Sequence, residues 1–233
     1  GRLYHMNAHG RVACLDAGTG KETWAVDVLE RFGARTVTWG QSESVLIDGK
    51  KVIATPAGQK ALMVALDKAT GETIWESPPL AEEKTSYTSP IIVEAGGQRM
   101  IVSAGSRHSF GVEAETGKLL WTHSHPIKEN VLGATPVFLK DSVFITSSSR
   151  EESVMYRLRL GSAGSEVSRA WSSAFKNGQG GTVCVSGRLF GGNGMEGNDG
   201  IVAIDPETGA VTKIEGGLTF GSSVVADGRI YYL

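Results

Sequence analysis

The chain contains little cysteine and no long apolar run. Two of its 233 residues are cysteine, Cys14 and Cys184, and each lies in an apolar segment with the character of a β-strand. We therefore expect both to be small buried side chains rather than partners in a disulfide or reactive thiols. No stretch approaches the roughly 18–20 consecutive apolar residues of a membrane-spanning helix, so no transmembrane segment is expected.

An excess of basic residues is also absent. Lysine and arginine together number 23 against 25 aspartates and glutamates, which leaves a formal net charge of −2. Nucleic-acid binding is therefore not expected, because phosphate recognition depends on clustered positive charge. Glycine, in contrast, is abundant at 31 residues, proline is modest at 7, and 40% of the residues are hydrophobic. This composition is typical of many short strands joined by tight turns.

One phrase recurs along the chain: an acidic residue, a Thr-Gly pair that begins three residues later, and a tryptophan four residues after the glycine. The acidic residue occupies positions 16, 67, 113 and 205, at intervals of 51, 46 and 92 residues, the last being twice 46. A degraded copy, from Tyr156 to Trp171, fills the gap, and Lys213 stands where the fifth tryptophan would be. The repeated positions are Asp16, Gly20, Trp24, Asp67, Gly71, Trp75, Glu113, Gly117, Trp121, Trp171, Asp205 and Gly209.

A second element lies between these phrases. It consists of a short β-branched or aromatic run, a turn such as Asp-Gly, and another such run, as in residues 44–54 and 223–232. This pattern indicates a β-hairpin. Each period therefore holds about four short strands, and no segment shows the 3.6-residue apolar spacing of a helical repeat. The repeat predicts an all-β fold, a β-propeller of four-stranded antiparallel blades with about five blades present.

We expect residues 1–233 to form a single propeller domain with blade periods of roughly 1–30, 40–80, 86–126, 131–173, 178–214 and 219–233. The glycine of each phrase fits a left-handed backbone position at the end of a turn. A large rigid ring after the last hairpin can cover the seam between neighbouring blades. The acidic residues, glycines and tryptophans of the phrases are therefore expected to dock blade against blade rather than to bind a ligand.

The Ala-x-Asp-x-x-Thr-Gly-x-x-x-Trp phrase, close at 13–24 and 63–75, resembles the tryptophan-docking motif of PQQ-like propeller repeats, named after pyrroloquinoline quinone. That family includes the quinoprotein alcohol dehydrogenases and the propeller lipoprotein of the outer-membrane β-barrel assembly machinery. Its members have seven or eight blades and work outside the cytoplasm. The resemblance covers essentially the whole chain and implies an extracytoplasmic protein, periplasmic or associated with the cell envelope. It also implies an excerpt of a longer ring, with a five-bladed ring as the alternative.

The resemblance leaves two classes of function open. Quinoprotein dehydrogenases hold the quinone beside a hard cation bound by carboxylate and amide oxygens, commonly under a disulfide between adjacent cysteines. This sequence has no Cys-Cys pair and no compact Glu, Asn and Asp arrangement. We therefore expect a non-catalytic scaffold that binds a protein or ligand, with no catalytic residue and no cofactor. The alternative is an alcohol or sugar dehydrogenase dependent on pyrroloquinoline quinone with calcium.

Several motifs that resemble sites are interpreted as ordinary loops. Residues 192–197 match the dinucleotide-binding glycine pattern, but a strand follows them where a helix would be required. Residues 192–199 also lack the terminal glutamate of a calcium loop. His5 and His9 are four residues apart, a spacing that aligns ligands on a helix but not on a strand and turn. His123 and His125 have no third ligand nearby, and all four are expected to be surface or loop histidines. No metal site is therefore expected.

A ligand or partner is expected at the mouth of the central channel, where the innermost strands and the loops between blades converge. The candidates are Trp39, Gln41 and Tyr87, which enter innermost strands, and Arg107 and His108 in a loop of one blade. An aromatic and basic cluster suits an anionic or sugar-like group, although ordinary loop side chains are the alternative. The expected partner is a protein, polymer or small ligand at the propeller face, and the full-length ring is expected to be monomeric.

Overall fold

The computed structural model describes residues 1–126, 133–148, 153–161, 166–175, 180–192, 200–215 and 221–232. Within these ranges the regular structure is antiparallel β-sheet apart from one short helix, α1 (Val28–Arg31). The predicted all-β fold with four-stranded antiparallel blades is therefore confirmed. That the chain forms one domain with the expected boundaries stays a prediction.

Each sheet is built from strands that follow one another along the chain. The described part begins with a three-stranded sheet of β1 (Arg2–Met6), β2 (Arg11–Asp16) and β3 (Glu22–Asp27). Four four-stranded sheets follow: β4 (Leu46–Asp48), β5 (Lys51–Ala54), β6 (Val64–Asp67) and β7 (Thr73–Glu76); β8 (Ile91–Ala95), β9 (Gln98–Ala104), β10 (His108–Glu113) and β11 (Leu119–Ser124); β12 (Val137–Leu139), β13 (Ser142–Ser148), β14 (Ser153–Leu160) and β15 (Val167–Ser173); β16 (Thr182–Val185), β17 (Arg188–Gly192), β18 (Ile201–Ile204) and β19 (Val211–Glu215). A hairpin of β20 (Ser223–Ala226) and β21 (Arg229–Tyr232) comes last.

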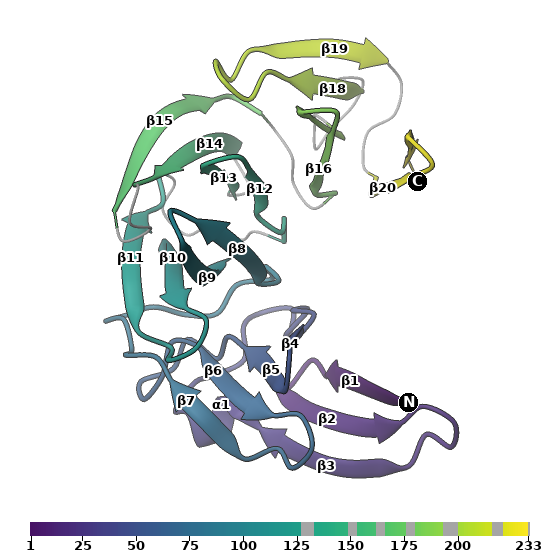
Figure 1. Cartoon of the computed structure of the whole chain (residues 1–233), viewed down its shortest axis with the longest axis vertical. Coiled ribbons are helices and arrows are strands. Elements are labelled where there is room, and N and C mark those ends of the chain that lie inside the picture. The colour runs from purple at the N-terminus through teal and green to yellow at the C-terminus, as the bar shows by residue number, and fades with distance from the viewer. Residues whose placement is uncertain are drawn as a thin grey trace.

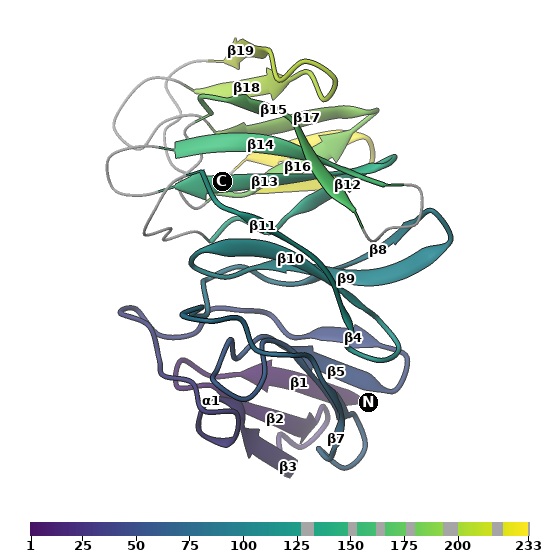
Figure 2. The same ribbon diagram turned by 90° about the vertical axis from the view of Figure 1, so that its left-hand side faces the viewer.

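The sheets succeed one another as blades around an arc (Figure 1). The first strand of each four-stranded sheet lies toward the inside of the arc, and the last strand lies on its outer side. Along the inside, β16 contacts both β12 and β20. The arc is open between the β1–β3 sheet and the β20–β21 hairpin. In the perpendicular view the sheets are stacked one after another (Figure 2).

The hydrophobic core is divided among the seams between consecutive sheets. At the first seam, Val12 and Trp24 of the first sheet pack with Val52 and Leu66 of the second. Three further clusters join the second sheet to the third, the third to the fourth, and the fourth to the fifth. Sheets in the middle of the arc therefore bury apolar side chains on both faces, as in other repeat architectures. Both cysteines are free, with Cys14 buried in the first seam and Cys184 half-buried.

The turn of the repeated phrase is organised by its acidic side chain. Asp67 Oδ1 accepts hydrogen bonds from the backbone N–H groups of Ala69 at 2.8 Å and Thr70 at 3.1 Å. These donors stabilise the carboxylate and hold the pKa of Asp67 below its usual range. Gly71 follows with φ of +77°, a left-handed conformation that disfavours a side chain. Asp16 caps the equivalent turn of the first sheet in the same way.

A β-bulge marks the last hairpin of the five larger sheets. In four of them the register shifts at the residue that pairs with the tryptophan. A bulge bends the strand locally and increases its twist, which re-aims the side chain beside it. The pairs are Trp24 with Cys14, Trp75 with Ala65, Trp121 with Gly111 and Trp171 with Arg157.

Candidate functional site

Three of the four repeated tryptophans make the same contact at a seam between sheets. The indole of Trp24 lies against Gly71 of the next sheet, where an added Cβ would be 2.8 Å from the ring atom Cε3. Glycine at this turn therefore satisfies both the left-handed backbone and the approach of the ring. The equivalent contacts are those of Trp75 with Gly117 and Trp171 with Gly209.

Trp121 differs from the other three. Its ring packs on Gly111 of its own sheet, where an added Cβ would lie 2.5 Å from the indole atom Cε2. Its Nε1 lies 3.5 Å from the sulfur of Met100. The fourth copy of the phrase lacks the Thr-Gly pair, and of its glycines only Gly161 is among the described residues, where it does not meet this ring.

The backbone carbonyl that follows an acidic residue of the phrase is a shared acceptor at the seams. Trp24 Nε1 donates to the carbonyl of Lys68 at 3.2 Å. Trp171 Nε1 donates to the carbonyl of Pro206 at 3.0 Å, and Arg157 Nη1 donates to the same atom at 3.0 Å. The tryptophan thus contributes a hydrogen bond to the seam in addition to its packing.

At the second seam a lysine takes the place of the indole as donor. Lys51 Nζ donates to the carbonyl of Ala114 at 2.7 Å and to Glu115 Oε2 at 2.8 Å, and it lies 3.2 Å from Asp48 Oδ2. Trp75 Nε1 is buried and makes no hydrogen bond within the described ranges. The side chains of Lys51 and Asp48 are each only 8% exposed.

Arg99 completes this ionic cluster. Its Nη1 donates to Asp48 Oδ2 and to Glu115 Oε1, each at 3.1 Å. The hydrogen bonds from Arg99, with a smaller contribution from Lys51, hold the pKa of Asp48 below its usual range despite burial. The sequence analysis did not identify this cluster, because its members belong to different sheets.

Four of the five predicted ligand residues contact one segment, residues 82–87, in the connection between β7 and β8, and the fifth, Tyr87, belongs to that segment. Trp39 and Tyr87 have ring centroids 5.7 Å apart and planes tilted by 49°. The backbone N–H of Trp39 donates to Tyr87 Oη at 3.3 Å, which fixes the exposed residue. Gln41 Oε1 accepts a hydrogen bond from Thr85 Oγ1 at 3.1 Å.

The two basic residues of the predicted site meet the glutamates of the same segment. His108 Nδ1 lies 2.8 Å from Glu83 Oε2, and the backbone N–H of Arg107 donates to Glu83 Oε1 at 2.9 Å. The Arg107 guanidinium is exposed and pairs with Glu82 Oε2 at 2.6 Å. Glu83 is buried and also accepts from Ser106 Oγ at 3.0 Å. Glu83 therefore anchors the β9–β10 loop to the 82–87 segment.

The predicted residues consequently differ in what they offer a ligand. Trp39 is 60% exposed and presents an aromatic surface beside Tyr87. Gln41 is buried, and His108 is held by a buried carboxylate. Since Glu82 already neutralises the charge of Arg107, the exposed part of this site is more aromatic than basic. It suits a partner that presents flat apolar or amphipathic groups better than an isolated anion.

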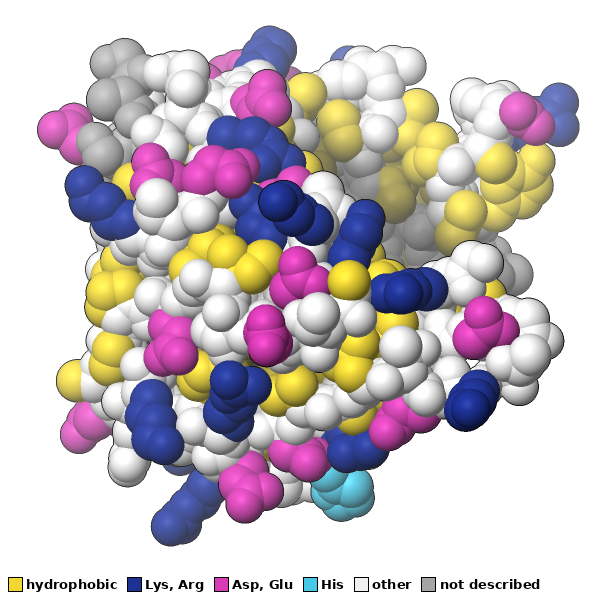
Figure 3. Space-filling view, turned by 60° about the horizontal axis from the view of Figure 1, so that its bottom comes forward, with side chains coloured by type: hydrophobic (Ala, Val, Ile, Leu, Met, Phe, Trp, Pro, Cys, Tyr) yellow, Lys and Arg dark blue, Asp and Glu magenta, His cyan; other side chains and the backbone are white. Residues whose placement is uncertain are grey.

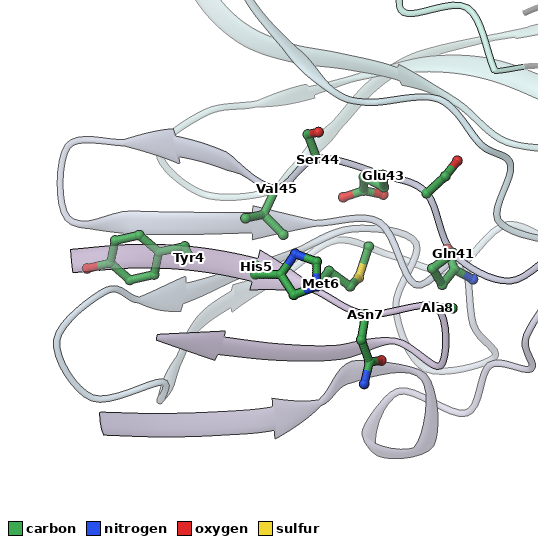
Figure 4. A pocket seen from close by; sticks show the side chains of 10 residues that line it. Tyr4, His5, Met6, Asn7, Ala8, Gln41, Glu43, Ser44 and Val45 are labelled. Carbon is green, nitrogen blue, oxygen red and sulfur yellow. The ribbon is translucent and has the colours of Figure 1, made fainter. Parts of the chain in front are cut away.

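A cavity of about 380 Å³ lies near this site, between β1 and residues 41–45 (Figure 4). Of the five predicted residues, Gln41 lines it. Glu43 lies beside Gln41 in the wall and is buried, and this burial raises its pKa to about 8. The sequence analysis did not identify Glu43, because the sequence does not show how deeply a glutamate before an inner strand is buried.

His123 lies in β11 and is half-buried, contrary to the expectation of a surface or loop histidine. His125 lies in the loop after β11, as expected, and is also half-buried. The ring of His123 stacks on Tyr156 with centroids 5.5 Å apart. His125 Nε2 lies 3.0 Å from the carbonyl of Gly105, and its Nδ1 lies 2.7 Å from Tyr156 Oη. The carbonyl can only accept, so Nε2 carries the proton and Nδ1 accepts from the tyrosine. Desolvation lowers the pKa of His125 to about 4.

The remaining sequence motifs give no site in the described part of the chain. His5 and His9 are exposed. Residues 193–199, which contain most of the glycine-rich motif, lie outside the described residues. Within the described ranges, no three histidines, cysteines or carboxylates are grouped so that they could hold a metal ion. The helix found in these ranges is too short to cross a membrane.

Comparison with known families identifies the repeat. The family model described as "Outer membrane protein assembly factor BamB" matches residues 1–215. This chain belongs to that family. The BamB-family propeller is also similar to a BamB of Nitrosomonas eutropha, with 28% identity over 123 residues, or 53% of this chain and 26% of that protein. The recognition of PQQ-like propeller repeats from the sequence is therefore confirmed.

This chain is similar to quinoprotein dehydrogenases as well. The 1-butanol dehydrogenase (quinone) of Thauera butanivorans is 26% identical over 145 residues, which are 57% of this chain and 22% of that enzyme. The chain thus spans about a quarter or less of the length of these relatives. The crystal structure of the quinohemoprotein alcohol dehydrogenase of Comamonas testosteroni matches the whole chain over 44% of its own length, with a TM-score of 0.60 and 14% identity. A computationally designed protein matches 99% of this chain over 64% of its own length, with a TM-score of 0.65 and 13% identity. These structural matches show the propeller fold.

Proposed function

We propose that this chain is part of a non-catalytic propeller outside the cytoplasm that binds a protein partner. The contact surface is the aromatic pair of Trp39 and Tyr87. Tyr87 belongs to the segment of residues 82–87, which connects β7 to β8. The observation that carries the proposal is the 60% exposed indole of Trp39, held in place by Tyr87. Exposed tryptophan and tyrosine on a rigid scaffold are the residue types that dominate binding energy at protein interfaces.

The family supports a protein as the partner. The matching family model and the relative from Nitrosomonas eutropha both carry the name of an outer membrane protein assembly factor. The same names support a location in the cell envelope. Across the face shown in Figure 3, basic and acidic side chains are interspersed without an area dominated by one sign. Such a face offers nothing that would favour nucleic acid.

The described residues do not fit the cofactor of the dehydrogenase relatives. A quinone site needs a cluster of oxygen ligands for a hard cation and flat groups on both faces of the ring. The described ranges contain no such cluster of carboxylates, and Cys14 and Cys184 lie in different sheets. A dehydrogenase that depends on pyrroloquinoline quinone and calcium therefore remains the alternative function.

Site-specific photo-crosslinking in the cell envelope tests the proposed surface. Benzoylphenylalanine is placed at position 39 of the full-length protein, and a matched variant carries it at Ile74, an exposed position on β7. We expect a discrete protein adduct from position 39 that disappears when Tyr87 is replaced by alanine, and none from position 74. Equal adducts from both positions, or none from either, would contradict a partner surface at Trp39.

An activity assay separates the two classes of function. The purified full-length protein is incubated with pyrroloquinoline quinone, Ca²⁺ and a dye acceptor, and alcohol and sugar oxidation are measured. We expect no turnover above that of the free quinone. Turnover that depends on the protein would overturn the non-catalytic assignment and favour the dehydrogenase.

A further inference from the structure

The turn that carries Trp39 is fixed on the connection between β1 and β2. The backbone N–H of Gly40 donates to the carbonyl of Val37 at 3.0 Å, which closes a tight turn around Trp39. An added Cβ at Gly40 would lie 2.9 Å from the Cβ of Ala8, so the turn packs directly against Ala8. The backbone N–H of Gln41 then donates to the Ala8 carbonyl at 2.9 Å. The turn therefore holds the backbone of Trp39 in one place.

Tyr87 is tied to the same turn. Its Oη accepts from the backbone N–H of Trp39 at 3.3 Å, and its carbonyl accepts from Ser42 Oγ at 3.3 Å. Both rings thus keep their positions in the absence of a partner. Side chains that are ordered in advance lose little conformational entropy on binding, so more of their contact energy contributes to affinity.

The two rings form a bent aromatic surface. Their centroids are 5.7 Å apart and their planes are tilted by 49°. Trp39 is exposed and Tyr87 is half-buried. A single flat group cannot lie face-down on both rings, whereas apolar groups that point in different directions can each contact one of them. A polyproline II helix has three residues per turn, so its successive prolines point to different sides. Neighbouring prolines of such a helix suit two rings set at an angle.

The free side-chain groups of this pair are hydrogen-bond donors. Trp39 Nε1 makes no hydrogen bond within the described ranges, and an indole N–H can only donate. The hydroxyl proton of Tyr87 is likewise not donated to any residue in those ranges. The partial positive charge of these two donors is complementary to carbonyl oxygens. A proline-rich segment presents carbonyls without competing donors, because proline has no backbone N–H.

We propose that the partner contacts this surface through a proline-rich segment in the polyproline II conformation. Its rings pack on Trp39 and Tyr87, and its carbonyls accept from Trp39 Nε1 and Tyr87 Oη. Aromatic surfaces on a rigid scaffold are a recurring means of recognising such segments, which are themselves extended before they bind. The inference rests on the proposed function and specifies which part of the partner reaches the aromatic pair.

Other ligand types fit the surface less well. An added β-strand needs an exposed strand edge, but Trp39 and Tyr87 both lie in connections between strands. A charged ligand would have to displace Glu82 from Arg107, the ion pair of the neighbouring loop. A glycan stacks on aromatic rings as well, but its hydroxyls seek acceptors in addition to the two donors offered here.

Nuclear magnetic resonance on the full-length protein tests the inference with hexaproline as the probe. The control peptide is a Gly-Ser repeat of the same length, which has as many carbonyls but no rings. We expect hexaproline to cause a saturable shift of the Trp39 indole N–H signal, which is assigned by its absence from Trp39→Phe. The Gly-Ser peptide should bind about tenfold more weakly, because it packs no rings and loses more conformational freedom.

Substitutions separate the contribution of the rings from that of the donor, with affinity for hexaproline measured by calorimetry. Trp39→Phe keeps an aromatic ring and removes the indole N–H, so binding should weaken about threefold to tenfold. Tyr87→Ala removes the second ring and should weaken binding by about tenfold or more. The matched control is Ile74→Ala, an exposed position on β7, which should bind as the wild type does. Circular dichroism verifies that each variant is folded. Equal affinity in all three variants would overturn the proposal.

The possible outcomes distinguish this inference from the proposed function. A Trp39 signal that does not move at millimolar hexaproline, or that moves equally with the Gly-Ser peptide, would refute a proline-rich ligand. A shift with chitotriose but not with hexaproline would refute it in favour of a glycan. If position 39 nevertheless crosslinks to a protein, the partner surface stands and only its proline-rich ligand is lost. Hexaproline binding without any crosslink would contradict the partner in the cell envelope and support the peptide preference.

Discussion

Single residues at the seams combine a backbone requirement with a packing requirement. Gly71 and Gly20 occupy the same turn position in consecutive sheets, with φ of +77° and +72°. Gly71 lies under the indole of Trp24, whereas nothing lies within 4 Å of the Cβ position at Gly20. Alanine substitutions at Gly20 and Gly71 therefore separate the energetic cost of the left-handed backbone from the cost of displacing the indole ring.

Alanine at these two glycines should destabilise the protein unequally. Gly20→Ala is expected to lower the free energy of unfolding by about 1–2 kcal/mol, the cost of a left-handed alanine. Gly71→Ala should lose a further 1–3 kcal/mol or so, because the methyl group displaces the indole. Urea unfolding monitored by tryptophan fluorescence measures both. Equal losses would show that the Trp24 contact contributes nothing at this turn.

Glu43 makes the stability of the fold depend on pH. Its folded pKa of about 8 lies above the value of 4.5 for an unperturbed glutamate, so the folded state binds more protons than the unfolded state between these limits. Wild-type stability should therefore fall relative to Glu43→Gln as pH rises from 5 to 7.5, by about 1.4 kcal/mol per pH unit. Urea unfolding at several pH values checks this. Ser44→Ala, on the same segment, removes no titratable group and should keep the wild-type slope.

Seams between elements differ in chemistry although the repeated phrase is the same. The carbonyl after the acidic residue accepts from Trp24 at the first seam, from Lys51 at the second, and from Trp171 with Arg157 at the fourth. A polar group buried at a seam has to keep a partner there, or its desolvation is not compensated. The ionic cluster of the second seam is therefore coupled to the docking of the second and third sheets.

Lys51→Met should weaken the second seam. The substitution leaves Asp48 with Arg99 alone and removes the donor to the Ala114 carbonyl, so we expect a loss of about 1–3 kcal/mol in the free energy of unfolding. Combining it with Asp48→Asn should cost less than the sum of the two single changes, since each removes the same ion pair. A double-mutant cycle in urea measures this coupling. Strict additivity would mean that the two side chains do not interact.

The strands, the hairpins and the repeated turn could be predicted because their signals are local. An acidic side chain that caps Thr-Gly and a glycine with positive φ leave a pattern within a few residues, as in Asp67–Gly71. Glu43 and Lys51 could not be predicted, because their burial depends on segments dozens of residues away. The half-burial of His123 and His125 could not be predicted for the same reason, since both rings contact Tyr156 of the next sheet. In the structure the five ligand candidates lie together at the segment of residues 82–87, but their role as a binding site stays a prediction.

At the scale of the 233-residue chain taken by itself, stability should decrease toward the last described strands. The second and third sheets pack on neighbours at both faces, whereas Val224, Val225 and Tyr231 of the β20–β21 hairpin are 56%, 41% and 47% exposed. In a linear array the units with a missing neighbour open most easily.

Hydrogen exchange of the 233-residue chain should follow this gradient. Backbone amides of β5, β6, β9 and β10 are expected to exchange at least a hundredfold more slowly than those of β20 and β21, because they open only when two seams are lost. Mass spectrometry of peptic fragments at neutral pH measures the difference. Uniform protection along the chain would indicate that the arc unfolds as one cooperative unit.

The different donors at the shared carbonyl also distinguish the first, second and fourth seams from one another. A blade moved to another place in the ring would put a lysine where an indole is expected, or a carboxylate opposite no cation. Near-identical blades risk pairing out of order while the chain folds, and mismatched polar groups penalise such arrangements. We therefore expect Lys51 and Arg157 to favour the native order of the blades.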